Sequence, residues 1–285
     1  DTNSDTSIPG ANLIAGIGYI SGVKCMIMID DSGIKAGAAS EATIDKALGC
    51  LDIALKQKLP CVHLVESAGV DLPNYSVKLW SKFGSVFYKK AKLSAAGIPV
   101  IAILHGFSTA GGAYQIGMSD YVIGVKGNGM AALAGSALLR AATGENASNS
   151  DIGGVEMHSV VTGSVEYLVN DDAESIITVR KLIDQLNWNE NDAQKTILNF
   201  EDPEYPIEDL AGIVPTDYSK GYDVREVIAR LVDQSVFIEL KPKYGISMVC
   251  AQAKIEGIQC GIIANNGPID TKGATKAAQF IQLCD

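Results

Sequence analysis

The stretch from Pro99 to Val125 constrains the fold of this chain more than any other part of the sequence. Val100 to Leu104 is an unbroken β-rich apolar run, which is the pattern of a strand buried on both faces. Small, helix-compatible residues run from Ala110 to Met118, and Tyr121 to Val125 is a second apolar run. The order predicted is therefore strand, tight turn, helix and strand.

Gly111 and Gly112 lie where this helix begins, and they predict a backbone site for an anion. A helix start leaves N–H groups unpaired, and glycine has no side chain to keep a ligand away from them. A thioester oxygen that becomes negative in an enolate is a charge that such groups stabilise. The alternative is structural, because glycine here also lets a helix pack closely against a strand. Spacing alone leaves both interpretations open.

Composition argues against several classes of partner. The chain has 285 residues, 47% of them hydrophobic and 20% charged, with a net charge of -10 and a pI near 4.8. Because no Lys/Arg cluster is present to neutralise phosphates, we expect no nucleic-acid partner, and we expect no membrane partner either. No apolar run is long enough for a transmembrane helix, and the acidic start from Asp1 to Asp5 is unlike a signal peptide. We expect a cytoplasmic protein, or one of the mitochondrial matrix in a eukaryote.

The six cysteines are scattered through apolar contexts without CxxC spacing. This pattern favours reduced core thiols over disulfides or zinc ligands, so we expect no metal in this chain.

Strand and helix patterns alternate along the first half of the chain and predict an α/β fold with parallel crossovers. A hairpin turning at Ser21-Gly22 comes first, followed by a helix near 44–55, a strand at 61–65 and a helix over 77–96. Beyond the central stretch we expect helices over 130–142 and 171–186. Residues 187–219 are polar and contain prolines, so they predict a surface linker.

The second half repeats an earlier pattern. Gly22 to Asp30 and Gly257 to Asn265 can be aligned, and each is followed by a small-residue loop and a helix. An amphipathic helix over 223–233 and strands over 245–254 and 259–264 are expected around the second copy, which stops early. The predicted domains are 1–200, a linker over 201–222, and the start of a second domain over 223–285.

Two other sequence patterns suggest different chemistry. Gly106-Phe-Ser-Thr-Ala110 resembles a degraded nucleophile elbow in which Ser108 attacks a carbonyl, with His63, His105 or His158 as base. The elbow lacks its second glycine, because Ala110 stands there. Gly16 to Gly22 resembles a dinucleotide fingerprint, but its spacing is off by one and a strand follows it, so we interpret it as structural.

A third interpretation joins the glycine turn to the segment from Val65 to Pro73. Both segments leave the C-terminal ends of neighbouring parallel strands, where α/β folds usually bind ligands. One N–H group from each, near Val70 and Gly112, would then converge on one carbonyl oxygen.

Here the sequence resembles the carboxyltransferase (β) subunits of biotin-dependent acyl-CoA carboxylases, and within them most the 3-methylcrotonyl-CoA carboxylase branch. The resemblance runs nearly end to end. The motifs that carry it are Val65-Glu-Ser-Ala-Gly69, Ser108-Thr-Ala-Gly-Gly-Ala-Tyr114, Ala141-Ala-Thr-Gly-Glu145, Gly153-Gly154 with His158, Asp171-Asp172, the segment from Asp223 to Asp233, and Ile262-Ile-Ala-Asn-Asn-Gly267.

The resemblance implies a crotonase-type (ClpP-like) fold of repeated ββα units, the second repeat incomplete. It implies that Gly111 and Gly112 hold the thioester oxygen, with Val70 a further donor, and that Gly112→Val damages turnover more than stability. The acyl-CoA contacts implied around them are Lys35, Ala68, Gly69, Thr109, Ala110, Ala113 and Tyr114. Carboxyl transfer from carboxybiotin then needs no general base from the protein, and the sequence shows no convincing acid/base dyad near the glycines.

The family also implies partners. No methionine of this chain is followed by lysine, so the biotin attachment motif Met-Lys-Met is absent, and biotin is expected on a biotin carboxylase or biotin carrier subunit. The C-terminal carboxyltransferase half is expected as a separate chain or a continuation, in a homo- or hetero-oligomer.

At some positions this sequence differs from the pattern of the 3-methylcrotonyl-CoA carboxylase branch. Lys35-Ala-Gly-Ala-Ala39 replaces an aromatic loop, Gly135-Ser-Ala137 replaces a Gly-Pro-Pro turn, and Ala68 replaces a glycine. A larger or differently shaped acyl chain is therefore as well supported as methylcrotonyl. A diverged assembly partner without activity stays an alternative.

Overall fold

A computed structural model describes residues 11–71, 74, 76–188, 200–217 and 219–285. The chain divides into two compact units, Asp1–Arg180 and Lys181–Asp285, and the boundary falls within helix α7 (Asp172–Gln185). The predicted domain limits at 200 and 222 stay predictions. The acidic start from Asp1 to Asp5 lies outside the described residues, as does part of the predicted linker.

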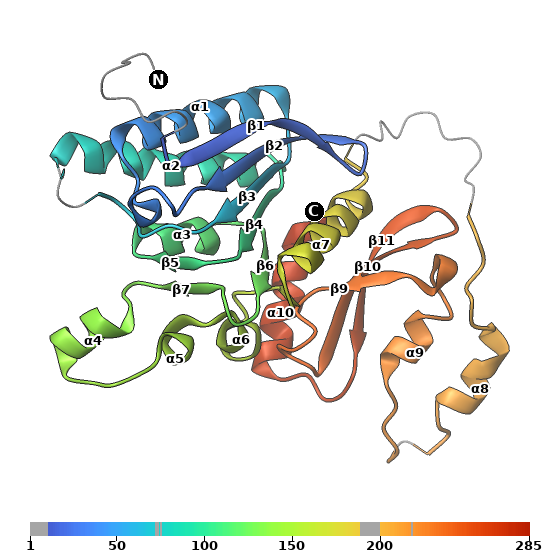
Figure 1. Cartoon of the computed structure of the whole chain (residues 1–285). Helices are drawn as coiled ribbons and strands as arrows, with labels where there is room; N and C mark the ends of the chain where they lie inside the picture. Colours follow the sequence, from blue (N-terminus) through green and yellow to red (C-terminus); the bar gives the residue numbers. More distant parts are fainter. Residues whose placement is uncertain (1–10, 72–73, 75, 189–199, 218) are drawn as a thin grey trace. The chain divides into compact units, whose positions relative to one another are not determined.

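The first unit is built on a six-stranded sheet (Figure 1). Its order is β1 (Leu13–Ile20), β2 (Val23–Asp30), β3 (Cys61–Val65), β4 (Val100–Leu104), β6 (Tyr121–Val125) and β8 (Tyr167–Val169). β1 and β2 are antiparallel, and every other neighbouring pair is parallel. All five residues of β4 are fully buried, as the unbroken apolar run predicted.

Helices α1 (Glu41–Gln57) and α2 (Val77–Ala95) pack side by side and against this sheet. The Ser40 side chain caps the start of α1, and the Thr43 side chain reaches back to the Ser40 N–H, so two otherwise unpaired donors are satisfied. The chain leaves α1 through Lys58 in the left-handed conformation. The Ser76 side chain caps α2 by accepting the Leu79 N–H, without a return bond like that of Thr43. Both helices confirm the sequence prediction to within a few residues.

The predicted helix over 130–142 is wrong at its start. Met130–Ala132 forms strand β7, which pairs in parallel with β5 (Phe107–Thr109), and helix α4 covers only Ser136–Thr143. The pairing explains the difference, because the Met130 N–H donates to the Gly106 carbonyl and tertiary hydrogen bonds override a weak helical pattern. Three short helical segments follow: α5 (Asn149–Gly153), α6 (Val155–Met157) and η3 (His158–Thr162).

The second unit contains a three-stranded antiparallel sheet. Its order is β11 (Ile258–Asn265), β10 (Met248–Ile255) and β9 (Phe237–Glu239). The helix predicted over 223–233 is present only as α9 (Val224–Ile228), since turns follow and the backbone at Val232 is extended. Within the predicted linker lie η4 (Ile207–Asp209) and α8 (Leu210–Ile213), and α10 spans Thr271–Cys284.

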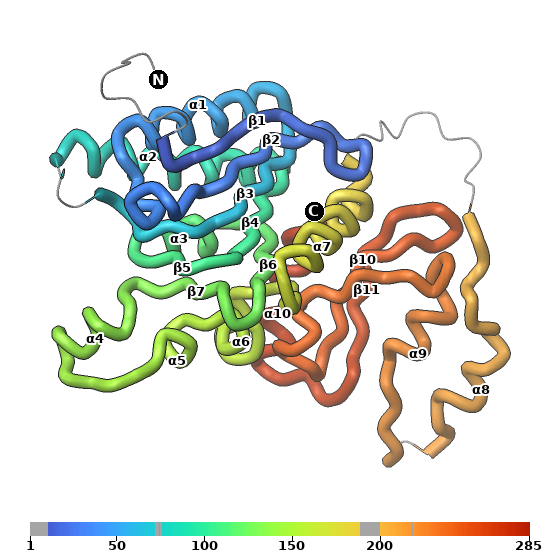
Figure 2. The backbone as a smooth tube through the Cα atoms, in the orientation of Figure 1, coloured from blue at the N-terminus to red at the C-terminus, as the bar shows by residue number. Residues whose placement is uncertain are grey.

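The internal repeat is visible in the backbone of both units (Figure 2). The β1–β2 and β10–β11 hairpins have eight residues in each strand and turn through two residues of positive φ. These φ values are 47° and 78° at Ser21 and Gly22, and 50° and 77° at Glu256 and Gly257. The two turns therefore share one conformation, which requires φ above zero at both positions. Each hairpin leads to a helix whose start is capped by a side chain, Ser40 or Asp270.

Gly16 to Gly22 forms the second part of β1 and its hairpin turn, with a strand following it, which fits the structural interpretation of that motif. Within the described part of the chain, no helix has the length and apolar character needed to cross a membrane.

Candidate active site

The turn from β5 into helix α3 (Gly111–Gly117) centres on Ala110, whose φ is 48° and ψ is -119°. This conformation is unfavourable for a residue with a side chain, and it persists only where surrounding contacts enforce it. The Ala110 N–H donates to the Ala132 carbonyl at 3.0 Å, and the Thr109 N–H donates to the Ser67 carbonyl at 2.9 Å. These bonds hold the turn between β7 and the loop after β3.

Both glycines of the turn are required by packing. A Cβ atom at Gly112 would lie 2.2 Å from the Ser67 carbonyl oxygen, and one at Gly111 would lie 2.3 Å from the Phe83 ring. The structural interpretation of the glycines therefore has direct support. It also makes Gly112→Val a poor test, because the substitution would displace the loop and lower stability as well as turnover.

The same glycines leave backbone donors unused. Among the described residues, no acceptor is found for the N–H of Gly111 or Gly112, and a helix start offers none of its own. Gly111 is partly exposed. The turn thus keeps the properties expected of an anion site, together with its packing role.

The loop of residues 66–70, which follows β3, lies directly against this turn. Gly69 has a φ of 91°, and a Cβ atom there would lie 3.2 Å from the Thr109 carbonyl oxygen and 3.3 Å from the Gly111 nitrogen. Val70 pairs with Ala39 as an isolated parallel bridge, through Ala39 N–H to the Gly69 carbonyl and Asp71 N–H to the Ala39 carbonyl. In such a bridge the N–H of Val70 faces away from Ala39, and it has no acceptor among the described residues.

Most of the other predicted contact residues gather around this junction. Ala68, Ala110 and Tyr114 are exposed, and Thr109 and Ala113 are half-buried. The Lys35 ammonium binds the Asp71 carboxylate at 2.9 Å, beside Val70. That hydrogen bond, with one from Asn74, lowers the pKa of Asp71.

An open pocket of about 320 Å³ extends along α3 and β7 from this junction. Its lining includes Ala113, Tyr114 and Gly117 of α3, Ala131 and Ala132 of β7 with Leu133 after them, and the polar groups of His158 and Ser164. The His158 ring contacts the Ala131 carbonyl through Nε2 at 2.8 Å and the Thr162 hydroxyl through Nδ1 at 2.9 Å. A carbonyl only accepts, so His158 Nε2 carries a hydrogen. This pocket could not be predicted from the sequence, because it depends on the pairing of β5 with β7.

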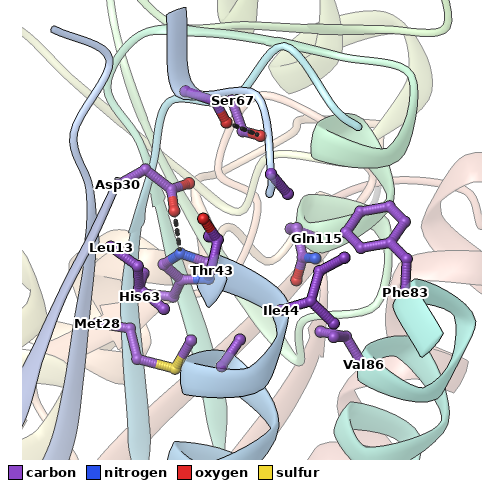
Figure 3. Close-up of a pocket in the computed structure, with 13 residues that line it drawn as sticks. Leu13, Met28, Asp30, Thr43, Ile44, His63, Ser67, Phe83, Val86 and Gln115 are labelled. Carbon is purple, nitrogen blue, oxygen red and sulfur yellow. Dashed lines mark hydrogen bonds and ion pairs between the residues drawn. The ribbon is translucent and has the colours of Figure 1, made fainter. Parts of the chain in front are cut away.

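A buried polar cluster beneath the loop was missed as well. Asp30, His63 and Gln115 line a cavity of about 30 Å³ together with Ser67 and Thr43 (Figure 3). Asp30 and His63 lie 3.1 Å apart and form an acidic and basic pair that the sequence did not predict.

The nucleophile interpretation of Ser108 is not supported. Ser108 is fully buried on β5, and its hydroxyl has no hydrogen-bond partner in the described part of the chain, so it has no base. The rings of His63 and His158 are engaged elsewhere, and His105 Nδ1 lies 4.0 Å from the Asp172 carboxylate.

Comparison with known proteins gives the class that this fold and site define. The carboxyl transferase domain family matches residues 1–285, and the chain belongs to that family. The β chain of methylcrotonoyl-CoA carboxylase from Dictyostelium discoideum is 41% identical over 98% of this chain and 47% of its own length. The biotin-dependent 3-methylcrotonyl-CoA carboxylase β1 subunit of Mycobacterium tuberculosis is also 41% identical, over 97% of this chain and 53% of its own length. The chain thus spans about half the length of these relatives.

Solved structures agree with this assignment. The geranyl-CoA carboxylase β subunit of P. aeruginosa is 45% identical, with a TM-score of 0.59 over 96% of this chain and 52% of its own. The transcarboxylase 12S structure with hydrolysed methylmalonyl-CoA bound is 29% identical, with a TM-score of 0.89 over 98% of this chain and 55% of its own. The predicted crotonase-type α/β fold is confirmed by this likeness.

Proposed function

We propose that this chain is the acyl-CoA side of the carboxyltransferase in a biotin-dependent acyl-CoA carboxylase, which moves a carboxyl group from carboxybiotin to an acyl-CoA. The observation that carries the proposal is the family match over residues 1–285, combined with unused backbone donors where the family's glycine motif occurs.

In this proposal the N–H groups of Gly111 and Gly112, with that of Val70 as a further donor, bind the thioester oxygen. Their hydrogen bonds strengthen as the oxygen becomes negative in the enolate, and a single donor of this kind contributes about 3 kcal/mol to the transition state. Carboxybiotin, carried on a partner subunit, supplies the CO₂ and the base that removes the acyl proton. Lys35, Ala68, Gly69, Thr109, Ala110, Ala113 and Tyr114 surround the acyl-CoA.

We assign the acyl chain to the pocket along α3 and β7. Its volume, about 320 Å³, lies in the range of small-molecule sites, and its lining is mostly apolar. The carboxylases named above are named for methylcrotonyl-CoA and geranyl-CoA, so the pocket is proposed to take an unsaturated or branched acyl chain. The small residues of the Lys35–Ala39 loop leave a larger or differently shaped acyl chain as well supported as methylcrotonyl.

The partners proposed are a biotin carboxylase or biotin carrier subunit and the C-terminal carboxyltransferase half. The free edge of β11 supports the second of these, because it is unpaired among the described residues, whereas the corresponding edge of β2 pairs with β3. A cytoplasmic or mitochondrial-matrix location goes with these partners.

The test is a panel of acyl-CoAs offered to the full protein with its biotinylated carrier. We expect carboxylated product from at least one branched or unsaturated acyl-CoA, and none when the carrier lacks biotin. Carboxylation of no member of the panel would support the alternative of an assembly partner. Biotin-independent thioester hydrolysis that Ser108→Ala abolishes would support the nucleophile alternative.

A further inference from the structure

Lys90 is a charged side chain buried completely inside the first unit. It lies on α2, and its Nζ reaches the His63 ring at Nδ1 over 3.4 Å and the Gln115 carbonyl oxygen over 3.3 Å. Burying an ammonium group is unfavourable unless specific partners compensate for the lost water. An apolar residue could be buried at this position without that cost, so the presence of a lysine indicates a specific role for its charge.

The donors and acceptors fix the direction of a hydrogen-bonded chain. An ammonium group only donates, so His63 Nδ1 is the acceptor and Nε2 carries the ring hydrogen. Nε2 then donates to Asp30 Oδ1 at 3.1 Å, the contact drawn in Figure 3. The other carboxylate oxygen, Oδ2, accepts the Glu66 N–H at 3.2 Å. The chain runs from Lys90 through a neutral His63 to Asp30 and on to the backbone.

The two ends of this chain hold the two segments of the proposed site. Glu66 is the first residue of the loop that carries Gly69 and Val70. Gln115 lies in α3, four residues after Gly111, which is about one helical turn. Each segment contributes N–H groups without an acceptor among the described residues, so their relative position decides whether those groups converge on one oxygen.

We propose that Lys90, His63 and Asp30 form a positioning relay that holds the 66–70 loop and α3 in the arrangement that carboxyl transfer requires. This inference rests on the proposed function. None of the three residues touches the substrate; they act through the backbone that does.

The charge of Lys90 makes the relay sensitive to pH. Desolvation lowers the pKa of Lys90 to about 8, and the negative charges of Asp30 and of Asp120, which follows α3, oppose that shift. Burial raises the pKa of Cys61 to about 11, so its thiol is neutral when Lys90 titrates. Above pH 8 the Asp30 carboxylate loses its balancing charge, and the relay weakens.

The kinetic test uses the full protein with its biotinylated carrier. Lys90→Met and Asp30→Asn are expected to lower kcat about tenfold to a hundredfold, with KM changed less than about threefold, because misplaced donors affect the transition state most. The wild type is expected to lose kcat above about pH 8, and Lys90→Met is expected to lack that limb. Lys92→Met, on the same helix but beside the exposed Tyr88 ring, is the matched control and should behave as wild type.

Two further measurements separate this proposal from a merely structural role. His63→Gln keeps a donor toward Asp30 and should retain most activity, whereas His63→Leu should not. Hydrogen exchange at Glu66 and along 111–117 should speed up in Lys90→Met and Asp30→Asn while the rest of the unit stays protected; this readout does not depend on activity.

Variants that match wild type in kcat, pH profile and exchange would overturn the relay. If the wild type transfers no carboxyl group, the proposed function fails; the exchange pattern then still decides whether the relay holds the two segments together.

Discussion

The contacts that a Cβ atom would make at Gly111 or Gly112 decide how the role of the glycine turn can be tested. Because Cβ atoms at Gly111 and Gly112 would collide with Phe83 and with the Ser67 carbonyl, glycine substitutions there change packing and chemistry together. The predicted separation of turnover from stability in Gly112→Val is therefore not expected. A residue that contributes to packing or to catalysis, but not to both, makes a better probe.

Ser108→Ala is such a probe. Its hydroxyl is buried without a partner in the described part of the chain, so removing it relieves an unsatisfied polar group. We expect unchanged kcat and KM and a free energy of unfolding raised by about 1 kcal/mol. Steady-state kinetics and denaturant titration check this together, and a large loss of activity with intact folding would return Ser108 to the list of catalytic candidates.

The lowered pKa of Lys90 predicts an unusual dependence of the free energy of unfolding on pH. Burial lowers its pKa from 10.5 to about 8, so between these values the unfolded chain binds more protons than the folded one. The free energy of unfolding should therefore rise from pH 8 toward pH 10.5, by about 3 kcal/mol at most. The thiols of Cys25, Cys61 and Cys250, whose pKa values burial raises to about 11, act in the opposite direction above pH 9.

Comparing wild type with Lys90→Met cancels the contributions of Cys25 and Cys250, whereas Cys61 interacts with Lys90 and does not cancel fully. The difference in unfolding free energy between the two proteins should grow in favour of wild type from pH 8 upward, in denaturant titrations at several pH values. A difference that does not change with pH would show that Lys90 keeps its ordinary pKa.

At the scale of elements, hydrophobic periodicity and turn-forming residues were sufficient to predict a helix or strand where a segment's own residues determine its structure. The buried run of β4, the helical spacing of α1 and α2 and the hairpin at Ser21-Gly22 are local signals, and each element formed as predicted. The sequence failed at β7 and after α9, where pairing and packing with distant residues decide the structure.

Part of the candidate site could be predicted from the sequence, and part of it depends on distant residues. That the 66–70 loop meets the glycine turn was predictable, because β3 and β4 are parallel neighbours and their C-terminal ends share one edge. The Asp30, His63 and Lys90 cluster was not. Met28 pairs with His63, which brings Asp30 diagonally close on the same face, and this register cannot be read from residues 33 positions apart.

Helix α3 offers a direct test of the acyl pocket. Gly117 lines that pocket at the end of the helix, has an ordinary φ, and has open space around the position of a Cβ atom. Gly117→Leu should therefore fold at least as stably as wild type, since glycine in a helix is unfavourable by about 1 kcal/mol. It should lower kcat/KM for long acyl chains about tenfold or more and leave short ones nearly unchanged.

The matched control is Gly49→Leu, in the exposed face of α1, where a Cβ atom also meets open space. An equal loss for short and long acyl-CoAs in Gly117→Leu would contradict the assignment of the acyl chain to this pocket.

For the whole molecule, the chain spans about half of its relatives, and the second unit presents β11 with one edge unpaired in the described residues. Ile258 and Ile263 of that strand are exposed. An open strand edge of this kind favours pairing with another chain. We expect light scattering after size exclusion to show an oligomer for the full protein, and a monodisperse, active monomer would contradict the oligomer.

In the proposed function, this domain transfers a carboxyl group from carboxybiotin to an acyl-CoA held by backbone donors. The most direct measurement follows labelled carboxyl from carboxybiotin on the carrier into acyl-CoA, with thioester hydrolysis recorded in the same reaction. We predict label in the acyl-CoA product, equal rates for wild type and Ser108→Ala, and no hydrolysis above background. Release of free CoA without transfer of label would contradict the account.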